Sequence, residues 1–424
     1  MTEETRPLSH QRLQGLALLL AVALLVLGNG LQATIVGVRG GLEAMSQEII
    51  GLIMSAYFVG FVLGSVYIPG LIQQVGHVRT FAALASIASA AALGFVIFVG
   101  PFPWVMLRAV TGACFAGMVI VTESWLNAGT TRDRRGRVLA VYSLVFYAAW
   151  AGGQPLLNVA PVDGFVLFAL VSVLFSLALV PITLTRTGVP GVVEADRADL
   201  KRLHQISPLG LIGAFALGLS VGAFWGMAPT FGQRIGLTEA EISIFLMLPL
   251  IGALLLQWPL GWVSDLVDRR WIILGACSAA AVCASGLMLT WDVRPFPFYL
   301  LVLLLGGFAM PVYSLCVAHV NDQIDTGEVV AAASGLILVY GLGSALGPFA
   351  ASVVMGQFGP AGLFAFMSAI LGLFAIYGLW RIGVSAAPDK GRKESYVSVP
   401  QTSHAVLPLH KHSPQRTPGK RAPR

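Results

Sequence analysis

The sequence predicts an all-α membrane protein of twelve transmembrane helices, arranged as two pseudo-symmetric six-helix bundles. Of its 424 residues, 56% are hydrophobic and only 11% are charged, and a water-soluble domain has no place to bury so much apolar surface. The apolar runs are long enough for helices of the ~20 residues that span a bilayer. They do not alternate as barrel strands do. Motifs of the first half also recur in the second half.

The twelve helices are placed on successive apolar runs. The first run follows Arg6 and Arg12 and could be read as a signal peptide. It is too long for that, and no Ala-x-Ala cleavage site follows it, so it is taken as the first helix. The expected helices are 13–38, 48–71, 78–100, 103–128, 138–160, 164–185, 207–231, 240–264, 271–291, 297–320, 330–355 and 360–382.

The domain boundaries follow from two polar stretches. A charged stretch at 186–206 is expected to link a first bundle, residues 1–185, to a second, residues 207–385. Residues 386–424 are rich in Pro, Ser, His, Lys and Arg and predict a disordered basic tail. This tail could contact anionic lipid headgroups, but a solvated tail is favoured.

The distribution of basic residues predicts the topology. All but four of the 26 Lys and Arg fall on one side if both termini are cytoplasmic. This asymmetry accounts for the basic pI near 9.3 and argues against nucleic acid as a partner. We therefore expect a multi-pass protein of the cytoplasmic (inner) membrane, in contact with the lipid bilayer and monomeric.

Enzyme and cofactor motifs are missing from the sequence. It contains no Walker loop, HExxH, GxSxG or dinucleotide fingerprint. Its four cysteines lie in apolar runs, and the tail histidines have no clear ligand spacing. We expect no metal, no cofactor and no enzymatic activity.

Three motif pairs indicate an internal duplication. Gly64 corresponds to Gly261, the segment ESWLN to AHVND, and AWAGGQP to GSALGP, at separations of 193 to 197 residues. Such repeats are typical of transporter folds.

The segment GWVSDLVDRR, residues 261–270, predicts a latch at a helix end. Gly261 permits close approach, Asp265 can face a helix N-terminus, and Arg269 and Arg270 can hold carboxylates of neighbouring helices. The alternative is an ordinary charged loop. The first-half copy is incomplete, because it keeps Gly64, Gly76 and Arg79 but has Ile68 in place of the aspartate.

Two ionisable residues fall inside the fourth helix, where charge is costly and usually functional. Glu123 could close a gate by pairing with Arg79 or with the arginines at 132–137, which is the favoured reading, or it could carry a coupling proton. Arg108 could meet a substrate anion or another polar group inside the protein, or its side chain could reach the outer interface. The two are 15 residues apart, ~22 Å along a helix, and cannot pair directly.

Small residues and prolines predict helix bends at Gly153, Pro155, Gly347 and Pro348, although simple close packing explains them as well. Polar residues within spans are candidates for the lining of a cavity: Asn29, Gln32, Tyr147, Gln154, Trp225, Gln257 and Tyr313.

Residues 8–385 resemble the major facilitator superfamily. The resemblance rests on the loop GWVSDLVDRR, the Arg-x-x-x-Gly of RAVTGACFAG and the glycine-proline motifs. In the superfamily, the glycine-proline motif on the fifth helix, here AWAGGQP, is associated with antiporters. The segments GHVRTFAAL, TESWLN, RRGRVLAVYS and GAFWGMAPTF are similar to the bacterial YcaD-like group. The resemblance implies two bundles that rock around a central cavity.

The expected function is secondary transport of a small solute by alternating access, with proton-coupled efflux or antiport as the favoured form. An uncoupled facilitator and a non-transporting membrane sensor or assembly partner remain as alternatives. The second-half latch favours a moving carrier over a static sensor.

Overall fold

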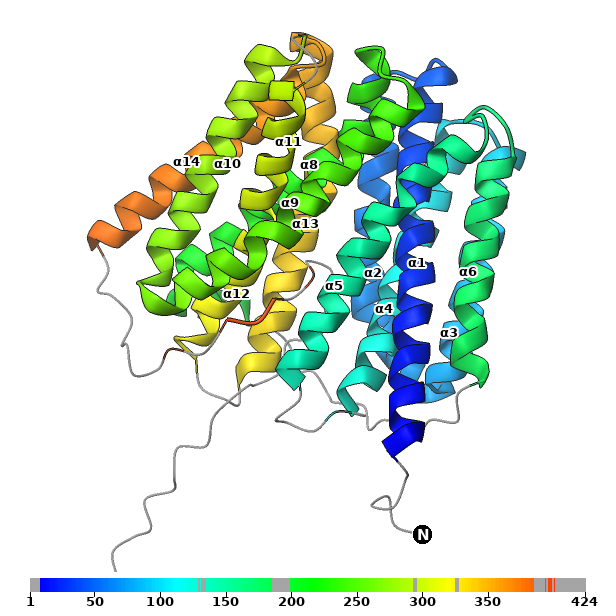
Figure 1. The fold of residues 1–424 in the computed structure, drawn as a ribbon, viewed down its shortest axis with the longest axis horizontal. Helices are drawn as coiled ribbons and strands as arrows, with labels where there is room; N and C mark the ends of the chain where they lie inside the picture. Colours follow the sequence, from blue (N-terminus) through cyan, green and yellow to red (C-terminus); the bar gives the residue numbers. More distant parts are fainter. Residues whose placement is uncertain are drawn as a thin grey trace, which may run out of the picture.

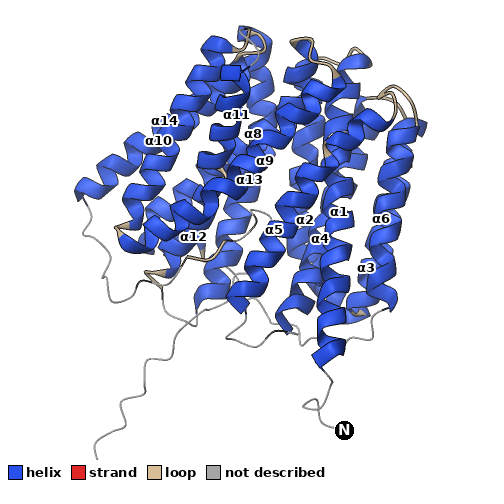
Figure 2. Cartoon of the chain, in the orientation of Figure 1, coloured by secondary structure: helices blue, strands red, loops and turns tan. Residues whose placement is uncertain are grey.

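A computed structural model of the chain shows an almost entirely helical molecule (Figures 1 and 2). It describes residues 8–128, 130, 135–184, 199–292, 296–324, 328–384, 393, 396–398 and 400. The expected linker 186–206 lies outside the described residues up to 198. The expected tail 386–424 also lies outside them, apart from the five residues just given.

Helices α1 to α6 form the first bundle, on the right in Figure 1. Their bounds are α1 Leu8–Leu42, α2 Gln47–Val75, α3 His77–Ile97, α4 Pro101–Ala128, α5 Arg135–Gly153, the 3-10 helix η3 Pro155–Val159 and α6 Val166–Leu184.

The second bundle lies on the left and follows a short helix, α7 Leu200–Ile206. It consists of α8 Pro208–Arg234, α9 Glu239–Leu266, α10 Arg269–Thr290, α11 Phe296–Ala309, α12 Pro311–Asn321, α13 Val329–Phe358 and α14 Gly362–Val384.

Eleven spans within the described residues are long and apolar enough to cross a membrane, with α11 and α12 counting as one span. The twelfth bundle helix is α5, which carries Arg135 and Arg137 in its first turn. The predicted fold of twelve membrane helices in two bundles is confirmed, and the helix ends agree within a few residues except where proline intervenes.

Local signals explain where several helices begin. The Ser46 hydroxyl caps α2 by accepting a hydrogen bond from the Ile49 N–H. Thr238 and Glu241 form a reciprocal capping box at the start of α9. Gly76 joins α2 to α3 with a φ of 91°, a conformation that favours glycine.

Glycines bring the long helices of each bundle into backbone contact. A Cβ on Gly218 of α8 would lie 2.2 Å from the Tyr340 carbonyl oxygen of α13, and one on Gly347 would lie 2.3 Å from the Leu219 carbonyl oxygen. In the first bundle, a Cβ on Gly64 would lie 2.7 Å from the Ala113 carbonyl oxygen of α4. Only glycine allows such close approach, which maximises dispersion contacts where lipid offers no hydrophobic drive.

Two of the predicted bends are helix breaks instead. The fifth helix was expected to continue through Pro155, but α5 ends at Gly153 and η3 begins at Pro155. Proline has no N–H to continue the ladder, and the Gln154 N–H turns to the Ala151 carbonyl three residues back. Pro348, in contrast, lies inside the continuous helix α13.

The expected tenth helix is likewise divided, because Pro311 begins α12 after α11 has ended at Ala309.

The two ends of the bundle differ in how the halves meet. We call the end where α1 begins the terminal end, and the end where α1 meets α2 the distal end (Figure 1). At the distal end the Thr230 hydroxyl of α8 donates to the Gly37 carbonyl of α1 at 3.1 Å. The Asn158 amide of η3 donates to the Ser243 hydroxyl of α9 at 3.0 Å. These bonds hold the halves together at the distal end.

Candidate functional site

A cavity lies between the two bundles, near the middle of their length. Its lining comes from both halves, which is the arrangement that a carrier of small solutes needs. The lining residues are Val26, Asn29, Ala33, Met54, Tyr57, Phe58, Arg108, Phe115, Phe146, Tyr147, Trp150, Trp225 and Tyr340, around about 660 Å³ free of protein atoms, open solvent included.

Among the described lining residues, Arg108 is the charged one. Its side chain is buried, at 2% exposure, and its guanidinium lies over the Tyr57 ring, 4.5 Å from the centroid. Such cation–π contact fixes the position of the group without neutralising its charge. The structure therefore favours the interior reading of Arg108 over a side chain that reaches the interface.

A pair of tryptophans lines the cavity on its distal side. The Trp150 ring of α5 and the Trp225 ring of α8 are 4.4 Å apart between centroids. Trp150 also lies on Gly30 of α1, where a Cβ would be 2.6 Å from the ring. One aromatic ring from each half thus meets at this end of the cavity.

Of the seven residues that the sequence suggested as lining, Asn29, Tyr147 and Trp225 do line the cavity. Gln154 instead has a structural role, accepting a hydrogen bond from the Thr34 hydroxyl at 2.7 Å. Tyr313 lies behind the lining and packs on Tyr340 at 4.9 Å. Gln32 and Gln257 are buried elsewhere.

Sequence reasoning missed most of the aromatic lining. Tyr57, Phe146 and Tyr340 are apolar-run residues like many others, and nothing in the sequence marks them as facing a cavity. Trp150 lies within the repeat motif AWAGGQP, and this position was the available sequence signal that it has a functional place.

Glu123 lies on α4 nearer the terminal end, and is 2% exposed. Its Oε1 accepts a hydrogen bond from the Tyr142 hydroxyl of α5 at 2.8 Å. Tyr313 of the second bundle lies near enough to interact electrostatically with the Glu123 carboxylate. Arg79, one of its suggested partners, is exposed at the start of α3. The arginines at 132 and 134 lie outside the described residues.

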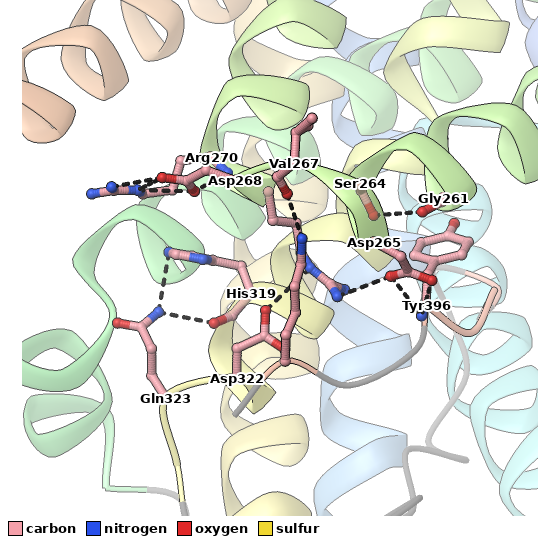
Figure 3. A network of polar contacts seen from close by, with 12 residues as sticks. Gly261, Ser264, Asp265, Val267, Asp268, Arg270, His319, Asp322, Gln323 and Tyr396 are labelled. Atoms are coloured by element: carbon pink, nitrogen blue, oxygen red, sulfur yellow. Dashed lines mark hydrogen bonds and ion pairs between the residues drawn. The ribbon is translucent and has the colours of Figure 1, made fainter. Parts of the chain in front are cut away.

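The second-half latch forms an ion network at the terminal end (Figure 3). Arg269 is almost fully buried and lies 3.1 Å from Asp265 and 3.1 Å from Asp322 of the loop after α12. A buried arginine is tolerated when carboxylates surround it in this way. The network ties the α9–α10 turn to the end of α12.

Arg270 stabilises the same α9–α10 turn through Asp268, the residue before α10. Asp268 caps α10 by accepting from the Arg270 N–H, and the two side chains form an ion pair at 2.7 Å. Burial raises the pKa of Asp268, but the hydrogen bonds from the Arg270 side chain and backbone outweigh it, so the pKa of Asp268 is lowered.

Gly261 contacts a segment from the end of the chain rather than another helix. A Cβ there would lie 2.1 Å from the ring of Tyr396, and Figure 3 shows this ring beside Gly261 and Asp265.

The first-half copy of the latch is apolar where the second is ionic. Ile68, in the aspartate position, packs toward Gly117 of α4, where a Cβ would be 2.6 Å from its Cδ1. Gly64 keeps its role of close approach to α4, and Gly76 forms the turn before the exposed Arg79.

Comparison with protein families decides the identity of this fold. The model of the Major Facilitator Superfamily matches residues 17–207 and 210–413. The chain belongs to the major facilitator superfamily. As a member it is a multi-pass membrane protein and a secondary transporter rather than an enzyme.

Curated relatives confirm that the chain is similar to the YcaD-like group of the superfamily. An uncharacterised MFS-type transporter of Enterobacter sp. (strain 638) is 24% identical and covers 88% of this chain and 97% of its own length. The uncharacterised MFS-type transporter YcaD of Escherichia coli O17:K52:H18 is 25% identical and covers 92% of this chain and 99% of its own.

Solved superfamily structures share the fold at low identity. The nucleoside transporter NupG has a TM-score of 0.72 at 12% identity and covers 87% of this chain and 98% of its own. A bacterial homologue of the human lysosomal transporter Spinster has a TM-score of 0.67 at 15% identity. It covers 92% of this chain and 99% of its own.

Proposed function

We propose that this transporter exports a small solute from the cytoplasm in exchange for protons, by alternating access of the cavity between the bundles. The observation that supports it most is the cavity, lined by α1, α2, α4 and α5 on one side and by α8 and α13 on the other. Because both halves contribute, a rocking motion would expose the same residues first to one side and then to the other.

Glu123 is the coupling or gating group in this proposal. It is a buried carboxylate in a membrane helix, bonded to Tyr142, and it lies between the cavity and the terminal end. A carboxylate in such surroundings can gain and lose a proton as the cavity opens and closes. The latch at Asp265, Arg269 and Arg270 would tighten and loosen at the terminal end during the same cycle.

In this proposal both termini are cytoplasmic, because Arg79, Arg137 and Arg202 lie at helix starts of the terminal end, and the chain is a monomer of the cytoplasmic membrane.

The test uses inverted membrane vesicles with an imposed pH gradient. A panel of organic acids, amino acids, sugars and cationic drugs is added to vesicles containing the wild type, Glu123→Gln or the control Glu239→Gln, which makes the same change at an exposed position. A coupled exporter collapses the gradient with wild type and control when its solute is added. If Glu123 carries the proton, Glu123→Gln loses this collapse but still exchanges labelled solute.

If Glu123 is a gate, Glu123→Gln instead slows coupled transport and exchange equally. Transport of a labelled solute by the wild type without any proton movement would contradict coupling and indicate an uncoupled facilitator.

A further inference from the structure

The cavity presents unpaired hydrogen-bond donors. Nε and Nη1 of Arg108 and the Nε1 atoms of Trp150 and Trp225 have no hydrogen-bond partner among the described residues. The Oδ1 of Asn29 is an unpaired acceptor in the same lining. Buried polar groups are normally paired, and an uncompensated guanidinium is especially costly to bury. The nitrogen donors among these atoms therefore point to a ligand that accepts hydrogen bonds.

Arg269, another deeply buried arginine among the described residues, has different surroundings. Arg269 is as buried as Arg108, at 2%, but has carboxylates of Asp265 and Asp322 at 3.1 Å. Around Arg108 none of the described lining residues is acidic, and its close electrostatic neighbour is Tyr57. Arg269 is neutralised by carboxylates of the protein, whereas no described lining residue supplies a carboxylate to Arg108. The negative charge that compensates Arg108 must therefore come from the solute.

The other lining residues indicate the chemical nature of the uncharged part of that solute. It is formed mostly by aromatic and aliphatic side chains, including Phe115, Phe146 and the Trp150–Trp225 pair. Such walls favour flat or apolar groups. A single positive charge matches one negative charge, and a guanidinium fork matches the planar geometry of a carboxylate.

From this geometry we infer that the transported solute is an organic monoanion, with a carboxylate held by Arg108 and an aromatic or apolar body against the tryptophan pair. The inference rests on the proposed function only in taking this cavity as the solute site. It is tested by binding without any gradient, so it can fail independently of coupling and of direction.

The binding test compares phenylacetate with its neutral amide and with phenethylammonium, three probes that share one ring. The full-length protein in detergent is unfolded by heat with a thiol-reactive dye, since Cys114, Cys277, Cys283 and Cys316 are buried in the fold. Phenylacetate should raise the unfolding temperature, and the other two probes should not. Arg108→Gln should weaken phenylacetate binding about ten- to a hundredfold, whereas Arg108→Lys keeps part of it.

The control is Arg79→Gln, which removes an exposed arginine and should bind phenylacetate as the wild type does. Equal binding of all three probes, preference for the ammonium, or unchanged binding in a folded Arg108→Gln variant would overturn the inference. So would the lack of any stabilisation of the wild type by phenylacetate up to about 10 mM.

A separate observation concerns residues near the C-terminus, which connect the two halves at the terminal end. The backbone N–H of Tyr396 lies 3.0 Å from each carboxylate oxygen of Asp265 on α9. The Ser398 carbonyl accepts a hydrogen bond from the Ser143 hydroxyl of α5 at 3.0 Å. Lys393 donates to the Val267 carbonyl. We call Lys393, Tyr396–Ser398 and Pro400 the strap.

The Tyr396 ring occupies the space that the missing side chain of Gly261 leaves, and it lies within electrostatic range of the cavity residue Tyr147. The strap thus lies across the terminal side of the cavity and engages both α9 and α5, helices that must move relative to each other in alternating access.

We propose that the strap is an autoinhibitory closure that holds the two halves together at the terminal end and must leave before the cavity can exchange with solvent there. Two variants should release it by different routes. Tyr396→Ala removes the ring, and Gly261→Ala fills the space that the ring occupies.

The measurement is maleimide labelling of Ser143→Cys, a position that is buried beneath the strap. This substitution replaces the hydroxyl that donates to Ser398 and leaves the Tyr396 contacts with Asp265 and Gly261 in place. In this background both Tyr396→Ala and Gly261→Ala should raise the labelling rate about tenfold or more, because the position beneath the strap then opens to the reagent more often. Tyr67→Ala, at an exposed tyrosine of α2, is the control and should leave the rate unchanged. Equal, slow labelling in all three variants, or fast labelling with the strap intact, would overturn the proposal.

Discussion

The indole rings of Trp150 and Trp225 lie 4.4 Å apart although they belong to opposite halves of the transporter. This contact lies between the cavity and the distal hydrogen bonds Thr230–Gly37 and Asn158–Ser243. Two successive layers of contact, one aromatic and one polar, thus join the halves on the distal side of the cavity. Each layer must separate if the halves rock apart there.

Removal of one ring should open the aromatic layer. Trp150→Ala is expected to increase several-fold the labelling of Asn29→Cys by an impermeant maleimide added at the distal side, because Asn29 lines the cavity below the pair. Trp150→Phe should have an intermediate effect. Trp380→Ala, at an exposed tryptophan of α14, is the matched control. Unchanged labelling in Trp150→Ala would show that the pair is not a barrier.

Glycine contacts should be essential for the packing of the second bundle. Gly218→Ala is expected to lower stability by about 1–3 kcal/mol, because the new Cβ would lie 2.2 Å from the Tyr340 carbonyl oxygen and force α8 from α13. Gly275→Ala and Gly372→Ala, which meet nothing within 4 Å, should be neutral or slightly stabilising. Unfolding in mixed micelles measures the difference, and an equal loss in all three variants would contradict the packing account.

The buried ion network should show strong coupling between its members. Arg269→Leu leaves Asp322 buried without its partner and is expected to cost on the order of 3–5 kcal/mol. The double variant Arg269→Leu/Asp322→Leu should be more stable than Arg269→Leu alone, because no buried charge of the pair then remains. Simple additivity of the two single substitutions in a double-mutant cycle would argue against this pairing.

The Asp268–Arg270 pair should contribute to stability in a defined pH range. Because the pKa of Asp268 is lowered in the fold, its contribution is present above the unfolded pKa of about 3.9 and is lost as the pH falls through the lower folded value. Arg270 is the cationic group in direct contact with this carboxylate, and the His319 ring and Lys393 also lie near it.

Asp268→Asn should therefore lower the unfolding temperature near neutral pH and show a smaller further loss in acid than the wild type. Asp292→Asn, at an exposed position, serves as the control. An acid profile of Asp268→Asn that parallels the wild type would rule out this role.

The sequence predicts the fold well because membrane helices are encoded locally, by long apolar runs between polar breaks. It predicts proline effects poorly. Pro229, Pro249 and Pro348 lie inside continuous helices, while Pro155 and Pro311 begin new ones. Local sequence does not distinguish these cases, since packing against neighbouring helices decides whether the freed carbonyl is accommodated.

The cavity is predictable only in part for a similar reason. Polar residues such as Asn29 are conspicuous in an apolar run, but an aromatic residue such as Tyr57 or Tyr340 could face lipid, core or cavity equally well. The contacts of Tyr396 with Gly261 and Asp265 join positions 131 and more residues apart. Neither hydropathy nor charge in the tail gives any sign of them.

Alternating access requires the halves to part at the distal end during each transport cycle. Asn158→Cys and Ser243→Cys together replace a hydrogen-bonded pair that joins the halves there. Oxidation to a disulfide should stop transport of whichever solute collapses the pH gradient in vesicles, and reduction should restore it, while neither single variant responds to oxidant. Undiminished transport by the fully cross-linked protein would contradict alternating access at this interface.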